Sequence, residues 1–366
     1  MYKQKIILFF SLILFSFICP LILSYLLCIK YPRYIPAEYW IKEAITIKEQ
    51  YIKTITNPKI IIISGSNSLF GVCTPLIKEK TNKEIVNFGL HAALPIEVFF
   101  ALIKRNAKPN DIILMPLEYT YYKKKNNITS WQANNLTSWG TEFIKEFSST
   151  QFLEILIKSV PSLPNRIKNF NVDLPIHTYE EHMQDKNSSA ILSLSSYRNA
   201  INNFGEILTD NKSKLKNDVT YAYVNPAGLN DFRFEQLKDF SDYLAKQNIR
   251  LILTYPVSMQ ISDFNLFKKE HLTKIEAVNK KCEGYGLDLI GIPELSNFEL
   301  PYSFDTEYHL NAEGAILRSL YLADTINCYL AGIPQEIADL EEYKNEKKAE
   351  AKKILEEYRK LGYFSE

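Results

Sequence analysis

An apolar run followed directly by small polar residues, at positions 59–71, places the strongest constraint on the fold. Its sequence is Lys-Ile-Ile-Ile-Ile-Ser-Gly-Ser-Asn-Ser-Leu-Phe-Gly. β-Branched residues favour an extended backbone, and so short a run bounded by serine and glycine is typical of a strand buried on both faces. Such strands belong to parallel sheets that helices cover. The chain is therefore expected to form an α/β domain, with these polar residues at the edge where such sheets bind ligands.

Further apolar strands alternate with amphipathic helices along the chain. We expect strands at 59–63, 84–88, 111–115, 249–254 and 287–290, and helices at 74–81, 95–106, 234–247, 264–283 and 312–330. Thr74 and Asn311 are suitable N-caps for two of these helices. This alternation predicts a five-stranded parallel sheet with right-handed crossovers.

The alternation stops between residues 118 and 223, after the third strand. We expect a mostly helical insertion there, over the carboxyl edge of the sheet, acting as a lid or a substrate platform. Within it, residues 143–160 have helical periodicity and residues 187–194 form a serine-rich loop. Tyr119, Tyr121 and Tyr122 could stack on a sugar, although packing is the more common role of aromatic residues at a sheet edge.

Residues 6–29 contain no charged side chain, and a helix needs about 20 apolar residues to cross the hydrocarbon core of a membrane. Lysine or arginine residues flank this run on both sides, so the charge bias is nearly balanced. The end of the run lacks the small-residue cleavage site of a signal peptide. We expect an uncleaved single-pass anchor in the cell membrane, with the main domain extracytoplasmic. A lipoprotein signal at Cys28 is the alternative.

The predicted organisation has four parts. They are an anchor at 1–33, a juxtamembrane connector at 34–57, an α/β domain at 58–332 with the insertion at about 118–223, and a charged, solvated helix within 333–366. A net charge of +1 provides no global field to attract nucleic acid. The five cysteines form no CxxC or Cys/His cluster at zinc spacing. We therefore expect no nucleic-acid partner, no metal and no cofactor.

A serine after the first strand and an acid–histidine pair after the fifth suggest nucleophilic catalysis. A serine nucleophile needs a base within hydrogen-bond reach, and the base needs an orienting acid. Because the carboxyl ends of parallel strands meet at one edge, Ser66 can meet His309, with Asp305 as the acid. The alternative without catalysis is that Ser66 is an ordinary loop serine and that His309 is a surface or helix-capping histidine. Ser64 or Ser68 would be the nucleophile under a shifted register, and Glu307 is a weaker candidate acid. His177, His182 and His271 are assigned to the surface.

These residues resemble the SGNH or GDSL-type hydrolases and acyltransferases. The family's Gly-Asp-Ser-Asn-Thr block lies over Ser64-Gly65-Ser66-Asn67-Ser68, with Gly65 in place of the aspartate. Asn87-Phe88-Gly89 matches the second block, whose glycine N–H helps form the oxyanion hole. The third block, Gly-x-Asn-Asp, is absent, and Pro116-Leu117-Glu118-Tyr119 stands there. In the last block, Asp-x-x-His, the acid lies one residue further from the histidine than usual.

The resemblance implies a three-layer α/β/α sandwich of flavodoxin-like type. It assigns the nucleophile to Ser66, the base to His309 and the orienting acid to Asp305. Gly89 is expected in the oxyanion hole, and Asn67 beside it or against the substrate. Glu118, which follows the third strand, could replace the missing asparagine in shaping the site, or could hydrogen-bond a turn, which is the preferred interpretation. No metal or cofactor is implied.

An anchor followed by a divergent domain looks most like membrane-bound members that modify cell-surface polymers. These include the alginate acetylation proteins and the protein of D-alanyl teichoic acid synthesis. The resemblance implies an O-acyltransferase or esterase acting on a cell-surface glycan through an acyl-serine, with an acyl donor and a multispanning membrane acyltransferase as partners. The alternatives are a catalytically inactive scaffold or binding protein in a polysaccharide modification or export complex, and a plain esterase or lipase.

Overall fold

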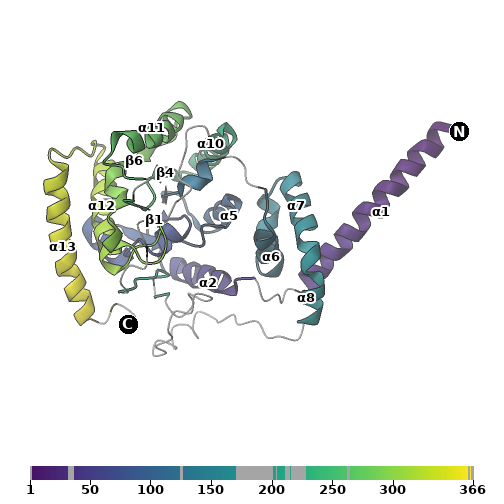
Figure 1. Ribbon diagram of the computed structural model, residues 1–366, viewed down its shortest axis with the longest axis horizontal. Helices are drawn as coiled ribbons and strands as arrows, with labels where there is room; N and C mark the ends of the chain where they lie inside the picture. The colour runs from purple at the N-terminus through teal and green to yellow at the C-terminus, as the bar shows by residue number, and fades with distance from the viewer. Residues whose placement is uncertain are drawn as a thin grey trace. The chain divides into compact units, whose positions relative to one another are not determined.

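The computed structural model divides into two compact units (Figure 1). One contains Met1–Lys42 and Asn126–His177, and the other contains Glu43–Lys125 and Thr178–Glu366. We call them the helical unit and the sheet unit. The structure describes residues 2–31, 37–123, 127–169, 201–202, 204–210, 215, 228–261, 264–361 and 363. The predicted loop at 187–194, His177 and His182 lie outside these residues. The boundaries of these two units differ from the boundaries of the four predicted parts.

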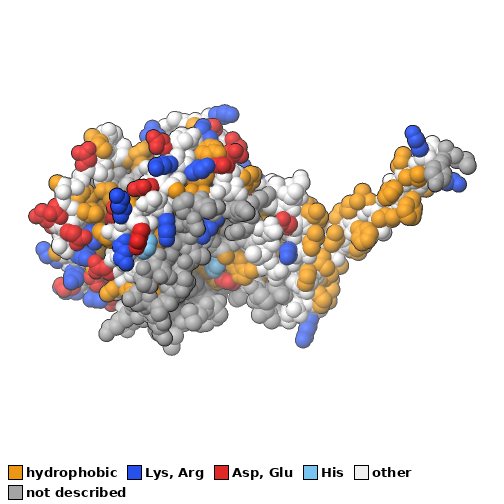
Figure 2. All heavy atoms as spheres, turned by 45° about the horizontal axis from the view of Figure 1, so that its top comes forward, with side chains coloured by type: hydrophobic (Ala, Val, Ile, Leu, Met, Phe, Trp, Pro, Cys, Tyr) orange, Lys and Arg blue, Asp and Glu red, His pale blue; other side chains and the backbone are white. Residues whose placement is uncertain are grey.

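The helical unit contains one long apolar helix and several short helices. They are α1 (Tyr2–Lys30), α6 (Ser130–Ser138), η2 (Thr141–Glu146), α7 (Ser149–Ser159), η3 (Val160–Ser162) and α8 (Leu163–Lys168). Helix α1 is long and apolar enough to cross a membrane, with a mean hydropathy of 2.9 over its most apolar window. Figure 2 shows hydrophobic side chains along its length. Helix α1 contacts α6, α7 and α8.

The single helical segment predicted at 143–160 is divided between η2 and α7, with Val160 already in η3. The chain leaves η2 in an extended conformation at Phe147, and Ser148 then caps α7. The Ser148 hydroxyl accepts the N–H of Gln151, and the Gln151 side chain accepts the N–H of Ser148 at 3.0 Å. This capping box starts a new helix where periodicity alone suggested one continuous segment.

The sheet unit is built on a parallel sheet, which confirms the α/β prediction. Its strands, in spatial order, are β2 (Glu84–Asn87), β1 (Lys59–Ile62), β3 (Ile112–Met115), β4 (Arg250–Thr254) and β6 (Leu289–Ile290). All four pairings are parallel, and Ile61 lies opposite Val86 on one side and Ile113 on the other. A second, two-stranded parallel sheet of β5 (Ser258–Met259) and β7 (Asn297–Phe298) was not predicted, because two residues carry no readable periodicity.

Helices of the sheet unit bury both faces of the sheet. They are α2 (Tyr39–Lys53, which begins in the helical unit), α3 (Ser66–Leu69), α4 (Thr74–Thr81), η1 (Tyr119–Tyr122), α5 (Ile96–Asn106), α10 (Asp231–Ala245), α11 (Lys269–Gly284), η6 (Pro293–Ser296), η7 (Leu300–Tyr302), α12 (Ala312–Ala331) and α13 (Leu340–Lys360). Ile60 and Ile62 pack in one cluster with residues of α4 and α12, including Ile326. Ile61 lies between them in sequence and is only 1% exposed, so the opposite face is covered as well. In Figure 1, α12 and α13 lie on one side of the strands, and α5 and α10 on the other.

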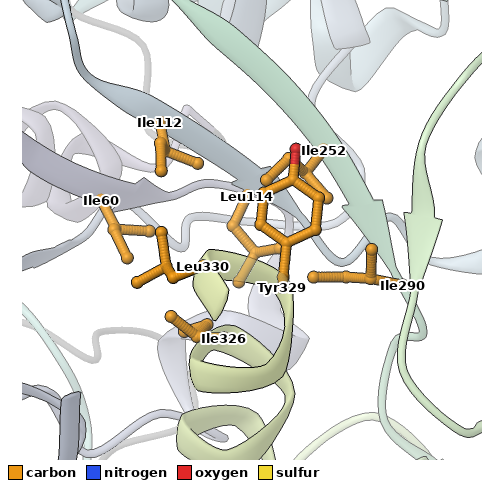
Figure 3. Close-up of a pocket in the computed structure, with 8 residues that line it drawn as sticks. All are labelled: Ile60, Ile112, Leu114, Ile252, Ile290, Ile326, Tyr329 and Leu330. Carbon is orange, nitrogen blue, oxygen red and sulfur yellow. The ribbon is translucent and has the colours of Figure 1, made fainter. Parts of the chain in front are cut away.

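A small apolar cavity of about 10 Å³ lies between α12 and the strands (Figure 3). Its lining consists of Ile60, Ile112, Leu114, Ile252, Ile290, Ile326, Tyr329 and Leu330. A buried water needs two or more polar partners, which a lining of aliphatic side chains and one ring does not supply. The cavity is a packing gap in the core and provides no group for chemistry.

Three local predictions can be checked directly. Asn311 caps α12 as expected, because its Oδ1 accepts the N–H of Gly314 at 3.0 Å. The prediction that Thr74 is an N-cap is wrong: Cys73 holds that position, and the Thr74 hydroxyl donates to Glu206 Oε2 at 2.6 Å. The surface assignment of His271 is also wrong. That side chain is buried, and its Nδ1 accepts a backbone N–H at 2.7 Å.

Candidate active site

Ser66 is presented on a tight turn beyond the carboxyl end of β1, as the first residue of the single-turn helix α3. Gly65 makes the turn possible, because a Cβ there would lie 2.3 Å from Glu118 Oε1 and 2.5 Å from Ala92 Cα. The aspartate of the family motif would not fit in this space. The glycine at that position is therefore required by the neighbouring carboxylate.

The structure distinguishes between the three serines of this turn. Ser64 and Ser68 are fully buried, and their hydroxyls hydrogen-bond each other at 2.6 Å. Ser66 is partly exposed, and its hydroxyl has no hydrogen-bond partner among the described residues. Of the three, Ser66 is the one that a solvent-borne substrate can reach.

A buried carboxylate holds the turn on both sides of Ser66. Glu118 Oε2 accepts the N–H of Gly65 and Oε1 accepts the N–H of Asn67, each at 3.2 Å. Glu118 follows β3, so it occupies the place of the missing Gly-x-Asn-Asp block. Its side chain is fully buried, and burial raises the pKa of its carboxyl group. Glu118 therefore supports the turn that carries Ser66 from inside the protein.

Arg318 of α12 completes this network from the opposite side. Its guanidinium donates to Asn67 O at 2.6 Å and to Asn67 Oδ1 at 2.9 Å. Burial lowers the pKa of Arg318 to about 9, against the opposing effect of Glu118, so the group remains charged at neutral pH. The Asn67 amide donates to Ser64 Oγ at 3.0 Å and to Pro116 O at 2.9 Å. All the polar atoms of this fully buried side chain are thus engaged inside the protein, away from any substrate.

Gly89, which was expected in the oxyanion hole, lies against α3. A Cβ at this position would lie 2.2 Å from Leu69 N. The N–H of Gly89 donates to Asn87 Oδ1 at 2.8 Å, and the Asn87 amide donates to Ser68 O at 2.9 Å. An oxyanion at this N–H would have to compete with the Asn87 oxygen. The N–H of Ser66, by contrast, has no hydrogen-bond acceptor among the described residues.

His309 and Asp305 form a close, mostly buried pair. His309 Nδ1 lies 2.6 Å from Asp305 Oδ1, and the two side chains are 8% and 11% exposed. The loop that carries them is closed by a bridge between Ser303 and Leu310. Asp305 therefore holds the histidine, in preference to Glu307, whose carboxyl pKa burial raises. His309 Nε2 has no hydrogen-bond partner in the part of the chain that the structure describes.

A ring stack brings this pair to the serine turn. The His309 imidazole stacks on Phe70, with ring centroids 4.1 Å apart and an interplanar angle of 17°. Phe70 caps α3, and its N–H donates to Ser66 O at 3.0 Å. The structure thus places His309 beside the turn that begins with Ser66, although the two residues are far apart in sequence.

One feature of the site was not predicted from the sequence, whereas packing, the role favoured for the tyrosines after β3, is confirmed. Arg318 was overlooked, although a charged residue between Leu317 and Leu320 of an otherwise apolar helix segment is a usable signal of a buried partner. The tyrosines after β3 are buried, and Tyr121 donates its hydroxyl to Ala92 O and Leu94 O. They pack inside the protein and offer no ring for stacking on a sugar.

The sequence was compared with models of known protein families and with curated proteins. No family model matches it, and no curated protein matches it either.

Proposed function

We propose that this protein is a membrane-anchored serine acyltransferase or esterase of SGNH type, acting on a cell-surface glycan outside the cytoplasm. The observation that supports it most is the Asp305–His309 pair stacked on Phe70, the cap of the turn that begins with Ser66. A partly exposed serine, a buried histidine and a carboxylate on its Nδ1 are the components of a serine nucleophile site. A flavodoxin-like arrangement of the sheet and its helices belongs to the same proposal.

In this proposal His309 Nε2 accepts the proton of Ser66 Oγ as that oxygen attacks the carbonyl carbon of an acyl group. Asp305 fixes the imidazole with Nδ1 protonated and stabilises the imidazolium that forms. The N–H of Ser66 faces the developing oxyanion, and His309 returns the proton to the leaving alcohol. A sugar hydroxyl or water then attacks the acyl-serine, giving transfer or hydrolysis.

A scaffold function is the second candidate, and the hydrogen bond from Gly89 to Asn87 favours it. This bond occupies a donor that the family uses for the oxyanion, and removal of one such donor costs about 3–4 kcal/mol of transition-state stabilisation in measured cases. A protein with this fold and no catalysis would serve as a binding component of a glycan modification complex.

Labelling with a serine-reactive fluorophosphonate, followed by intact mass and peptide mapping, distinguishes the two candidates. We expect a single adduct on Ser66 of the full-length protein in detergent, and at least a 100-fold slower reaction in His309→Ala, because general-base assistance is typically worth 10²–10⁴-fold. The matched control is His271→Ala, which removes another buried histidine that stacks on a phenylalanine. It should react at the wild-type rate.

Absence of an adduct from folded protein, or an adduct that forms equally fast in His309→Ala, would support the scaffold function. An adduct on Ser64 or Ser68 would mean that the serine assignment is wrong.

A further inference from the structure

Helix α7 of the helical unit exposes large apolar side chains on one side. Phe152 is 37% exposed, and Leu153 and Ile157 are each 49% exposed. Leu153 and Ile157 are four positions apart and so share one side of the helix, and Phe152 flanks them where α7 meets α1; we call these three residues the α7 apolar face. Ile167 of the next helix, α8, is 46% exposed as well. Exposed apolar groups that gather in one place mark a surface that something covers.

The α7 apolar face lies beside the last turns of α1. The Tyr25 ring of α1 packs edge-on against Phe152, with centroids 5.5 Å apart. Cys28 Sγ contacts Ser159 O at 3.6 Å, and Arg166 donates to Cys28 O at 3.1 Å. Helix α7 therefore contacts the carboxyl-terminal end of α1 at both Phe152 and Ser159.

The length of α1 sets the depth of this contact. An α-helix rises about 1.5 Å per residue, so about 20 residues cross a hydrocarbon core roughly 30 Å thick. Counted from Ile6, where the uncharged run begins, that distance ends near Tyr25. A membrane that encloses the apolar part of α1 must therefore reach Phe152, which packs on Tyr25.

The charges near the α7 apolar face also suit a membrane surface. Lys158 follows Ile157 on α7 and is exposed, Lys168 follows Ile167 on α8 and is exposed, and Lys30 ends α1. Lysine beside exposed apolar residues is the composition of helices that lie in the boundary between lipid headgroups and acyl chains. In Figure 2 hydrophobic side chains continue from α1 onto the helices at its base.

We propose that the α7 apolar face lies in the bilayer interface and is covered by lipid, so that α7 and α1 enter the membrane together. This inference rests on the membrane anchoring by α1 that forms part of the proposed function. In this arrangement α1 is not the only element in the membrane, because α7 of the helical unit also contacts the bilayer. Phe152, Leu153 and Ile157 contact acyl chains, and Lys158 contacts headgroup phosphates.

Spin labels read by electron paramagnetic resonance test this in the full-length protein, reconstituted into phosphatidylcholine–phosphatidylglycerol vesicles. Single cysteines replace Leu153 or Ile157, in a background in which the partly exposed Cys19 and Cys328 are changed to alanine. Leu14→Cys on α1, 60% exposed, is the bilayer reference, and Ile333→Cys in the sheet unit, 58% exposed, is the aqueous reference. Each label is measured for accessibility to oxygen and to a water-soluble nickel complex.

We expect the labels at 153 and 157 to show a several-fold higher oxygen-to-nickel accessibility ratio than the label at 333, as the label at 14 does. Nickel accessibility equal to that at 333 would overturn the inference, while a bilayer signal at 14 would leave the anchor intact. Shielding from both reagents would also overturn it, by showing that a protein partner covers the face. A water-exposed label at 14 would instead contradict the anchoring itself.

Discussion

Each compact unit contains a fully buried arginine at a junction of distant segments, and the two arginines have different surroundings. Arg318 of the sheet unit donates to Asn67, whose N–H donates to the buried Glu118 carboxylate. Arg166 of the helical unit donates to Cys28 O at the end of α1, to Thr137 Oγ1 of α6 and to Ser162 Oγ. The same guanidinium geometry thus balances a charge in one unit and links helix ends in the other.

The different surroundings of the two arginines reflect the different local structure that each one stabilises. Around Ser66 the backbone makes a turn so tight that Gly65 has no room for a side chain, and charges on both sides fix it. Around Cys28 the requirement is to hold a long apolar helix against short polar-capped ones. A planar group with five donors satisfies several oxygens at once in either setting. The predictions below test whether the two arginines act separately.

The largest expected effect is on stability, from Arg318→Met. Removal of one partner of a buried charge network leaves the other uncompensated, so the free energy of unfolding should fall by about 3–5 kcal/mol. Urea unfolding followed by circular dichroism measures it. The double variant Arg318→Met/Glu118→Gln should lose less than the sum of the single losses, because neither charge then remains buried alone. Strictly additive losses would show that the two side chains do not interact through Asn67.

Arg166→Met should have a smaller effect, confined to the helical unit. Carbonyl and hydroxyl oxygens lose a donor, which costs about 2–3 kcal/mol when they stay buried. All three tryptophans of the chain, Trp40, Trp131 and Trp139, belong to this unit, so their fluorescence reports its unfolding selectively. Arg359→Met, which removes a half-exposed arginine of α13, is the control and should change stability by at most about 0.5 kcal/mol.

The reactivity of Ser66 separates the two arginines further. Arg166→Met should leave the fluorophosphonate labelling rate unchanged, whereas Arg318→Met should slow it, because only Arg318 contacts the serine turn. Equal slowing in both variants would mean that the units are coupled and that the comparison fails.

The sheet could be predicted from the sequence because its strands are apolar, β-branched and short, and their order follows from the alternation with helices. The limits of the strands are off by a residue or two and those of the helices by up to five, and Cys73 takes the cap position expected for Thr74. That exchange has a tertiary cause: the Thr74 hydroxyl binds Glu206, a residue in a distant segment. No local signal in the sequence contains that information.

Ser66, Asp305 and His309 could be proposed from the sequence, because residue type and position relative to strand ends carry that signal. The residues that hold these three side chains in place could not be predicted from the sequence. The bond between Arg318 and Asn67 joins residues 251 positions apart, and the stack of Phe70 on His309 likewise joins two distant segments of the chain. The packing of α6, α7 and α8 against α1 was not predicted for the same reason, since the apolar run was interpreted only as a membrane anchor.

Another buried basic side chain, Lys48 on α2, gives a test that depends on pH. Its Nζ donates to Asn87 O at 2.8 Å and to Gly205 O. Burial lowers the pKa of Lys48 to about 7, with Glu206 opposing that shift, whereas an unfolded lysine has a pKa near 10.4. Between these two values the unfolded state binds more protons than the folded state, so this group makes the protein more stable as pH rises through that window.

The slope due to Lys48 is at most about 1.4 kcal/mol per pH unit, the value for a difference of one proton. Urea unfolding at pH 7, 8 and 9 measures the free energy of unfolding of the wild type and of Lys48→Met. The wild-type value should rise with pH relative to that of the variant, because the contributions of the other titrating groups are the same in both proteins. Parallel profiles would show that the lysine keeps its proton in the folded protein. In that case Lys48 would resemble Arg318 as a permanent buried charge, and the contrast between these two residues would disappear.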